Sequence, residues 1–362
     1  MRTAILAMAV AAALPRAAAA DADSAPRPRD SKQHFQAHSM GTVVDLTLWS
    51  DDASGASAAA EAVFAEFRRI DQLMSNWVDT SDVSKINAGA GVTAVAVGDE
   101  TLKLIQFAQS VSKKSGGAFD ITVGAYRGLW KFDEDIDGTI PSARDVAARR
   151  KLTGWRDVVV DPKKKTIKLR RKGMAITLGG IAKGYAVDRA VSLLRGRGFN
   201  DFIMQAGGDL YVSGTKGGQK WRVGIRDPRG GRDATFAITE LQDRTFSTSG
   251  DYERGFVKDG VRYHHILDPK TGHPARLCRS VTVSAKDAIT ADAWSKPLFI
   301  LGPERGLKLL KGMPDLQAVF VDAKNQIRTS PGLTVVEGDI KKELAAGLAG
   351  KLLILKRPTD AP

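Results

Sequence analysis

The chain has 362 residues, and its 43% hydrophobic and 26% charged residues are typical of a folded globular protein, which excludes wholesale disorder, collagen and coiled coil. Its single cysteine excludes a disulfide framework within the chain and metal sites built from several cysteines. The net charge of +13 favours anionic partners, such as a phosphorylated small molecule, anionic lipid or nucleic acid, without choosing among them.

The first twenty residues have the pattern of an export signal. Arg2 precedes an apolar run over residues 4–14, too short to span a bilayer, and the alanines at 18–20 offer a cleavage site. We therefore expect a signal peptide at 1–20, no lipid anchor, and a periplasmic mature chain without an integral membrane segment. Residues 21–33 are polar and contain proline, which predicts a disordered lead before a single domain over 34–356 and a short tail at 357–362.

Hydrophobic periodicity and turn residues predict the elements of this domain. They are, in chain order, a strand at 42–49, helices at 54–77, 101–114 and 143–150, a hairpin over 158–161 and 166–170, a helix at 183–197 ended by Gly198, a strand at 202–205 with a tight turn at 206–209, short strands to about 285, a helix at 287–311 with a Gly-Pro break at 302–303, and late strands at 318–321 and 352–355. Strands and helices mix without strict alternation, which favours an α+β fold.

Two glycine-rich segments have a composition that would let a ligand come close to the backbone. Residues 178–188 place glycines and Lys183 at a helix start, where N–H groups can hold a phosphate, but the segment lacks the spacing of a P-loop or a dinucleotide fingerprint. The alternative, that the glycines only allow the helix and a strand to pack closely and that Lys183 is solvated, fits the segment equally well. In the second segment, Gly207 and Gly208 permit close approach, and Asp209 either binds a ligand or stabilises its own turn.

Histidine and carboxylate residues near the C-terminal half are the candidates for acid–base chemistry. His264 and His265 adjoin on an expected strand, so their side chains face opposite sides and do not easily bind one metal together. Either one could act as a general acid or base beside Asp268, or be structural. Asp292 and Lys296 lie four residues apart at an expected helix start, where the carboxylate could hold Mg²⁺, pair with Lys296 or favour the helix N-terminus.

Taken in order, these motifs resemble the ApbE family, the FAD:protein FMN transferases. The resemblance extends from Met40 to about Gly302 and rests on Met40-Gly-Thr42, Ser75-Asn-Trp-Val78, Ser84-Lys-Ile-Asn87, Phe119-Asp-Ile-Thr-Val-Gly124, Ala182-Lys-Gly-Tyr-Ala-Val-Asp188, Ala206-Gly-Gly-Asp209, Ser249-Gly-Asp-Tyr252, His265-Ile-Leu-Asp-Pro269 and Ala291-Asp-Ala293. It implies mixed sheets with packed helices around a deep FAD cleft. It also implies transfer of the FMN moiety of FAD to a Thr or Ser hydroxyl of an extracytoplasmic flavoprotein, within a Ser-Gly-Ala-Thr type motif, with release of AMP.

The resemblance also implies which residues form the site. His265 matches the family histidine linked to transfer and is our candidate base or hydrogen-bond donor, with Asp292 and Lys296 as further catalytic candidates. The carbonyl of Ala182 and the carboxylate of Asp292 match ligands of Mg²⁺. The expected FAD-binding residues are Met40, Trp77, Phe119, Asp120, Lys183, Asp188, Gly207, Gly208, Asp209, Ser249 and Gly250.

One position departs from the family pattern. Lys296 stands where the family has a threonine whose hydroxyl binds the metal, and a charged lysine is not a metal ligand. Either the Lys296 ammonium takes the place of the cation, or Ser295 supplies the hydroxyl after a local shift, so the need for Mg²⁺ stays open. Pro297 is compatible only with the first turn of a helix.

Three other functions remain open from the sequence. A non-catalytic FAD-binding or carrier protein would keep the cleft without the chemistry, and an FAD pyrophosphatase would release AMP without an acceptor. A polyanion-binding protein could use the basic runs at 163–165 and 170–172, but these lack interleaved aromatic residues for base stacking, so we expect no nucleic-acid partner.

Overall fold

The computed structural model describes residues 32–132, 135–231, 234–333, 336–337 and 354–356. The predicted signal peptide, most of the predicted lead and the predicted tail lie outside these ranges. No helix of the described residues is long and apolar enough to cross a membrane.

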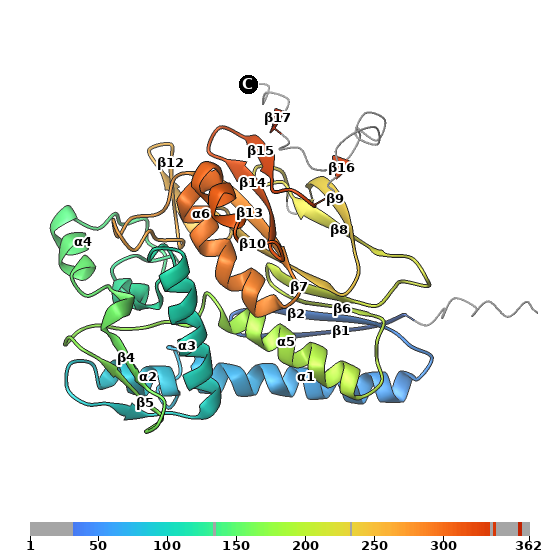
Figure 1. Cartoon of the computed structure of the whole chain (residues 1–362), viewed down its shortest axis with the longest axis horizontal. Helices are drawn as coiled ribbons and strands as arrows, with labels where there is room; N and C mark the ends of the chain where they lie inside the picture. The colour runs from blue at the N-terminus through green and yellow to red at the C-terminus, as the bar shows by residue number, and fades with distance from the viewer. Residues whose placement is uncertain (1–31, 133–134, 232–233, 334–335, 338–353, 357–362) are drawn as a thin grey trace, which may run out of the picture.

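A large antiparallel sheet forms the centre of the described chain (Figure 1). Its strands, in spatial order, are β1 (Lys32–Ser39), β2 (Thr42–Trp49), β6 (Phe202–Ala206), β7 (Asp209–Ser213), β10 (Arg244–Gly250), β13 (Cys278–Ala285), β14 (Gln317–Asp322), β15 (Gln326–Thr329) and β17 (Ile354–Lys356). Alternate residues of a strand point to opposite faces, so both faces need a cover. In β14, Phe320 faces one hydrophobic cluster and Val319 and Val321 face the other.

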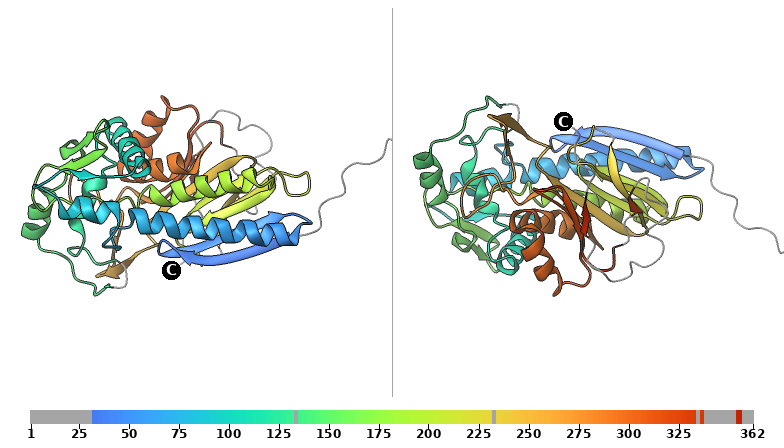
Figure 2. Two further views of the ribbon diagram at one scale, coloured as in Figure 1. Left: turned by 90° about the horizontal axis from the view of Figure 1, so that it is seen from below. Right: turned by 90° about the horizontal axis from the view of Figure 1, so that it is seen from above.

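Three helices cover one face of this sheet: α1 (Ala53–Met74), α5 (Ala182–Gly196) and α6 (Ala288–Leu310). Figure 2 shows α1 and α5 side by side along the sheet. Asp52 caps the start of α1 by accepting a hydrogen bond from the Gly55 N–H, and the helical spacing of Val63, Phe67 and Ile70 places all three in the core. The other face is covered by a small sheet of β8 (Trp221–Arg226), β9 (Thr235–Leu241) and β16 (Val336–Glu337).

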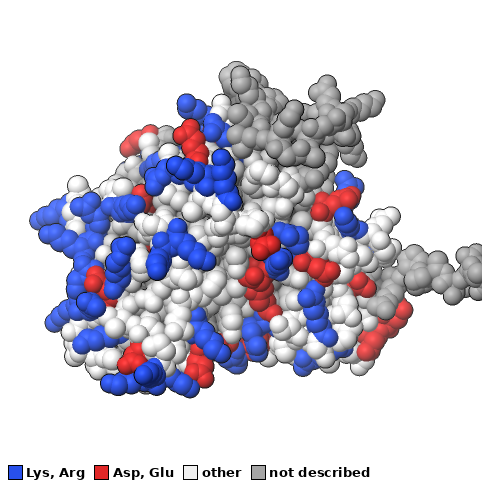
Figure 3. Space-filling view, viewed as in Figure 1, with Lys and Arg blue, Asp and Glu red and all other residues white. Residues whose placement is uncertain are grey.

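A second lobe packs against the ends of these helices. It contains α2 (Asp82–Ala88), β3 (Val95–Ala96), α3 (Asp99–Lys114), the 3₁₀ helices η1 (Ile121–Tyr126) and η2 (Trp155–Asp157), α4 (Ala143–Arg150), β4 (Val158–Asp161) and β5 (Thr166–Leu169), and the hairpin of β11 (Gly255–Lys258) and β12 (Val261–His264) packs on it. Lys and Arg side chains gather over the part of this lobe that carries α4 (Figure 3). A basic surface of this kind attracts anionic partners.

The structure confirms the α+β class and most of the predicted elements. The strand at 42–49 and the helix at 143–150 have the predicted ends, and Gly198 adopts the positive φ expected after α5. Gly302 interrupts α6 with a φ of 74°, as the Gly-Pro break predicted.

Three predictions about the ends of elements were wrong. The predicted lead ended at 33, but β1 begins at Lys32, because a two-residue turn with positive φ at Met40 and Gly41 pairs this polar segment with β2. The first long helix ends at Met74, three residues before Trp77, because Ser75 is already extended. Pro297 lies in the interior of α6 and not in its first turn.

Candidate active site

Helices α5 and α6 are held together by reciprocal hydrogen bonds, in which a carboxylate of each helix accepts from backbone N–H groups of the other. Asp188 of α5 accepts hydrogen bonds from the N–H groups of Ala288 and Ile289 at 2.7 and 2.9 Å. Asp292 of α6 accepts one from the Gly184 N–H at 3.0 Å. The first N–H groups of a helix have no partner within the helix, and a carboxylate there is favourable. Close approach requires glycine at 184, because a Cβ there would lie 2.4 Å from the Ala288 carbonyl oxygen.

Lys296 forms an ion pair with the buried Asp292. Its Nζ contacts Asp292 Oδ1 and donates to the Asp292 carbonyl oxygen at 2.9 Å. Asp292 is fully buried, whereas the Lys296 side chain is 21% exposed, so the lysine extends from the core toward the surface. Burial lowers the pKa of Lys296, and the nearby Asp209 carboxylate opposes that effect. A Cβ on Gly180 would lie 3.8 Å from Lys296 Cε and 3.4 Å from the Phe119 ring.

A second ion pair lies at the turn between β6 and β7. Lys183 Nζ lies 3.2 Å from Asp209 Oδ2, and the Ser247 hydroxyl donates to Asp209 Oδ1. The turn depends on its glycines: Gly207 has a φ of +59°, and a Cβ on Gly208 would lie 2.7 Å from a backbone carbonyl oxygen of β10. Asp209 is therefore held by the sheet while Lys183 stands at the start of α5.

The two ion pairs belong to one cluster. Asp209 and Lys183 both act on the pKa of Lys296, the first raising it and the second lowering it. The Ser295 hydroxyl donates to the Asp292 carbonyl oxygen and lies 2.8 Å from Ser249 Oγ, which joins α6 to β10. We call Lys183, Asp209, Asp292 and Lys296, with Ser249 and Ser295, the lysine–aspartate cluster. Two lysines beside a helix N-terminus are suited to binding phosphate groups.

The two neighbouring histidines have different environments. The His265 ring places Nδ1 3.3 Å from the Arg254 carbonyl oxygen, which can only accept, so Nδ1 carries the hydrogen and Nε2 can take a proton. Desolvation lowers the pKa of His265, and His264, Arg254 and Lys183 act in the same direction, which favours the neutral base. In His264, Nε2 donates to the Ala275 carbonyl oxygen at 2.8 Å and Nδ1 accepts from the Ile266 N–H at 3.3 Å. Both nitrogens of His264 are used within the fold.

Other predicted residues lie around this cluster or serve the fold. Met40 occupies the β1–β2 turn, and Arg254 links that turn to His265 because its guanidinium donates to the Gly41 carbonyl oxygen at 3.4 Å. Trp77 is 62% exposed and carries the Arg127 guanidinium 3.8 Å above its ring.

Four further residues from the sequence analysis have structural positions. The Asp120 carboxylate accepts from the Thr122 N–H and hydroxyl and from the Trp155 N–H, so it holds η1 and η2 together. Ala182 is buried as the first residue of α5. Gly250 ends β10 where a Cβ would lie 2.4 Å from the Tyr252 ring. Asp268, expected beside an imidazole, accepts from the Lys270 N–H within its own turn. Their part in ligand binding stays a prediction, as does the deep cleft.

Sequence reasoning missed Ser247 and Gly180. Ser247 and Ser249 are both buried and lie two residues apart in β10, so they point to the same face. Two hydroxyls at period two in a buried strand are a signal of a polar site and could have been noticed in the sequence.

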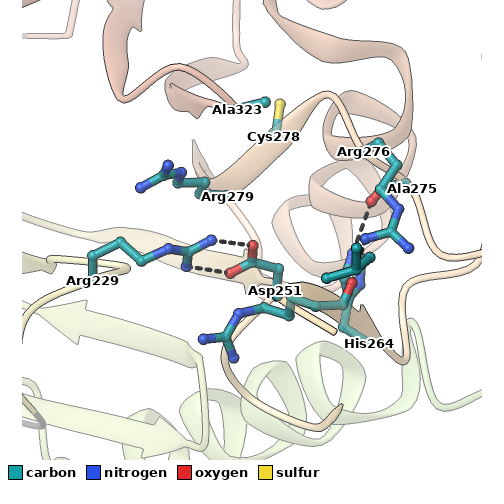
Figure 4. Close-up of a pocket in the computed structure, with 11 residues that line it drawn as sticks. Arg229, Asp251, His264, Ala275, Arg276, Cys278, Arg279 and Ala323 are labelled. Atoms are coloured by element: carbon teal, nitrogen blue, oxygen red, sulfur yellow. Dashed lines mark hydrogen bonds and ion pairs between the residues drawn. The ribbon is translucent and has the colours of Figure 1, made fainter. Parts of the chain in front are cut away.

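A pocket of about 310 Å³ lies next to Asp251, His264 and Cys278 (Figure 4). In its wall Arg229 and Asp251 form two hydrogen bonds of 2.7 Å each. The pocket contains none of the site residues that the family resemblance implies, although His264 lines it and it adjoins Gly250 and His265 in the chain. Its lining includes the charged residues Arg229, Asp251, Arg262, Arg276 and Arg279, together with His264 and Cys278. We therefore place the candidate chemistry in the lysine–aspartate cluster, where buried carboxylates position the cations.

Comparison with known proteins decides the family, because residues 40–320 match the ApbE family over most of the chain. The chain belongs to the ApbE family. It is 34% identical to an FAD:protein FMN transferase of Klebsiella pneumoniae, over 81% of this chain and 90% of that protein. It is 33% identical to an FAD:protein FMN transferase of Treponema pallidum, over 81% of this chain and 85% of that protein.

Solved structures of ApbE proteins share the fold. The ApbE protein of Thermotoga maritima superposes with a TM-score of 0.76 at 36% identity, covering 83% of this chain and 97% of that one. The apo form of the flavinyl transferase ApbE from Pseudomonas stutzeri gives 0.72 at 31% identity, covering 88% and 98%. The nearly complete coverage of both proteins shows that this ApbE chain has the full fold of its relatives.

Proposed function

We propose that this ApbE protein is an FAD:protein FMN transferase. The observation that carries the proposal is the lysine–aspartate cluster at the N-terminus of α5, in a chain whose relatives are named for this activity. Two lysines and a helix N-terminus favour a pyrophosphate, the group at which FAD would be cleaved. FAD is thus the substrate, and a flavoprotein is the acceptor.

In this reaction the oxygen of an acceptor Thr or Ser hydroxyl attacks the phosphorus of the FMN half of FAD. The bond from that phosphorus to the oxygen shared with AMP breaks, and AMP leaves with that oxygen. Phosphoryl transfer depends on positioning and on neutralisation of charge. His265 Nε2 takes the proton of the hydroxyl, and Lys183 and Lys296 stabilise negative charge on the pyrophosphate as AMP leaves.

The expected setting of the reaction comes from the sequence. Residues 1–20 support export to the periplasm, and the resemblance to the family implies an acceptor with a Ser-Gly-Ala-Thr type motif. Met40, Trp77 and Phe119 supply apolar or aromatic surface for the flavin or adenine rings, and Gly207, Gly208 and Ser249 lie near the phosphates in this proposal.

A mass measurement tests the proposal against its two enzymological rivals. The mature chain is mixed with FAD and a candidate acceptor domain, and the acceptor mass and the released AMP are followed together. We expect an FMN-sized gain on the acceptor with one AMP released for each gain. AMP release without acceptor would indicate a pyrophosphatase. Bound FAD with no gain on the cognate acceptor would indicate a carrier.

A further inference from the structure

The resemblance to the family implies Mg²⁺ at Asp292, and the residues around Asp292 allow a test of that fit. Lys296 Nζ is in contact with Oδ1, and the Gly184 N–H binds Oδ2. Both carboxylate oxygens therefore already have a hydrogen-bond donor. Asp292 is also completely buried, so its access to a ligand passes by the ammonium.

The neighbouring oxygen donors do not complete a metal site. The Ser295 hydroxyl donates its hydrogen to the Asp292 carbonyl oxygen and has Ser249 Oγ as its second partner. Mg²⁺ requires near-octahedral oxygen ligands, and it usually takes one or two carboxylates with waters. In the described part of the chain, no three His, Cys, Asp or Glu side chains form a group that could hold a metal. Asp209, the other carboxylate of the cluster, is bound by Lys183 and Ser247.

The charge of Lys296 also argues against a metal ion at Asp292. A divalent cation on Asp292 Oδ1 would have to displace the Lys296 ammonium or stand next to it, and two cations at contact distance repel strongly in a partly buried site. The residues present therefore do not fit Mg²⁺.

We propose that Lys296 is the resident cation of this site and that the protein transfers FMN without a divalent metal. This inference rests on the proposed function. An ammonium has three N–H donors, and two of those of Lys296 are used by the carbonyl and carboxylate oxygens of Asp292. The third is available to the pyrophosphate, beside Gly180 in the loop that precedes α5. Asp292 then acts as a positioning residue that holds Lys296 against the α5 N-terminus.

Binding of Mn²⁺, followed by electron paramagnetic resonance, tests this assignment without any turnover. The mature chain is titrated with Mn²⁺ in the presence of FAD. We expect no Mn²⁺ bound by the native chain and one per chain bound by Lys296→Thr, which removes the ammonium and adds a hydroxyl. Lys286→Thr is the matched control, because Lys286 makes an exposed ion pair with Asp315 and should leave the chain without Mn²⁺.

The assignment fails if the native chain binds Mn²⁺ and Asp292→Asn abolishes that binding. It also fails if a folded Lys296→Thr variant gains no Mn²⁺. A variant that does not fold is replaced by Lys296→Gln, which keeps the length of the side chain and removes its charge.

Transfer rates provide the second readout. We expect the native rate to change by less than about 2-fold between Mg²⁺ and chelator, and Lys296→Met to lose about 10²–10³-fold in both while still binding FAD. A native rate that collapses in chelator and returns with Mg²⁺ would overturn the inference. Absence of transfer to every acceptor under both conditions would instead remove the proposed function, and the Mn²⁺ titration would still decide which cation occupies the site.

Discussion

The lysine–aspartate cluster and the arginine-lined pocket differ in how firmly their cations are held. In the cluster the carboxylates of Asp209 and Asp292 are buried, and each fixes one lysine at the start of α5. In the pocket Arg229 is likewise held by the buried Asp251, but Arg276 is exposed and stacks on Tyr263 at 5.0 Å. A cation held by a buried partner has a defined position, whereas an exposed cation is screened by solvent.

The two adjacent histidines show the same difference. In the described residues His265 uses only Nδ1 in a hydrogen bond, whereas His264 uses both nitrogens in the fold. Neighbours in the chain thus serve two different regions, because successive side chains of an extended segment point to opposite sides. Substitutions in the two regions can therefore separate the residues that we propose for the reaction from those that support the fold.

The largest effect is expected from His265→Gln. Loss of a general base costs about 10²–10⁴-fold in rate, and the thermal midpoint should stay the same because Gln can still donate to the Arg254 carbonyl oxygen. Initial rates of mass gain on the acceptor measure this effect. His264→Gln is the matched control and should change stability more than rate; equal losses of rate in the two variants would erase the distinction between them.

The next effect concerns pH and His264. Desolvation lowers the pKa of His264 to about 4, so the folded state resists a proton that the unfolded state accepts at the ordinary value of 6.5. Above pH 6.5 His264 is uncharged in both states and does not change the free energy of unfolding. As the pH drops to 4, the unfolded state takes up the proton first, and the free energy of unfolding falls by about 3 kcal/mol. Urea unfolding at both pH values should show a smaller acid loss for His264→Gln than for the native chain. The same substitution at exposed His38 is the control, and an unchanged acid loss in His264→Gln would contradict this account.

Substitution of Gly184 tests how closely α5 and α6 must approach each other to position the two lysines. Gly184→Ala adds a Cβ 2.4 Å from the Ala288 carbonyl oxygen, and overpacking of this kind costs about 1–3 kcal/mol. Gly196→Ala, in the same helix with nothing within 4 Å of its Cβ, should be neutral or stabilise by up to about 1 kcal/mol. Urea denaturation compares them, and equal stability of the two variants would show that the helices can move apart without cost.

The smallest effect is expected in the pocket. Arg262→Ala should change the transfer rate by less than about 2-fold, as surface substitutions away from a site do. The acceptor mass assay measures it at low and moderate salt. A loss of 10-fold or more at moderate salt would show that the pocket belongs to the reaction and would remove the contrast between the two regions.

The sequence by itself determined the α+β class, the family resemblance and most local elements. Periodicity and turn residues act over a few neighbours, which is why the strand at 42–49 and the helix at 143–150 were predicted to the residue. The order of motifs identified Lys183, Asp209, His265 and Asp292 as candidates, but not what each one touches.

Only the tertiary structure decided how those residues are used. Asp292 bonds to a backbone N–H 108 residues away, and Asp188 bonds to α6 across 100 residues; no local pattern encodes such contacts. The strand β1 exists because β2 pairs with it, although its own sequence is polar. A helix places Lys296 beside Asp292 because the two are four residues apart, and this much is local. Lys296 becomes a candidate for binding phosphate only because α6 packs against the start of α5.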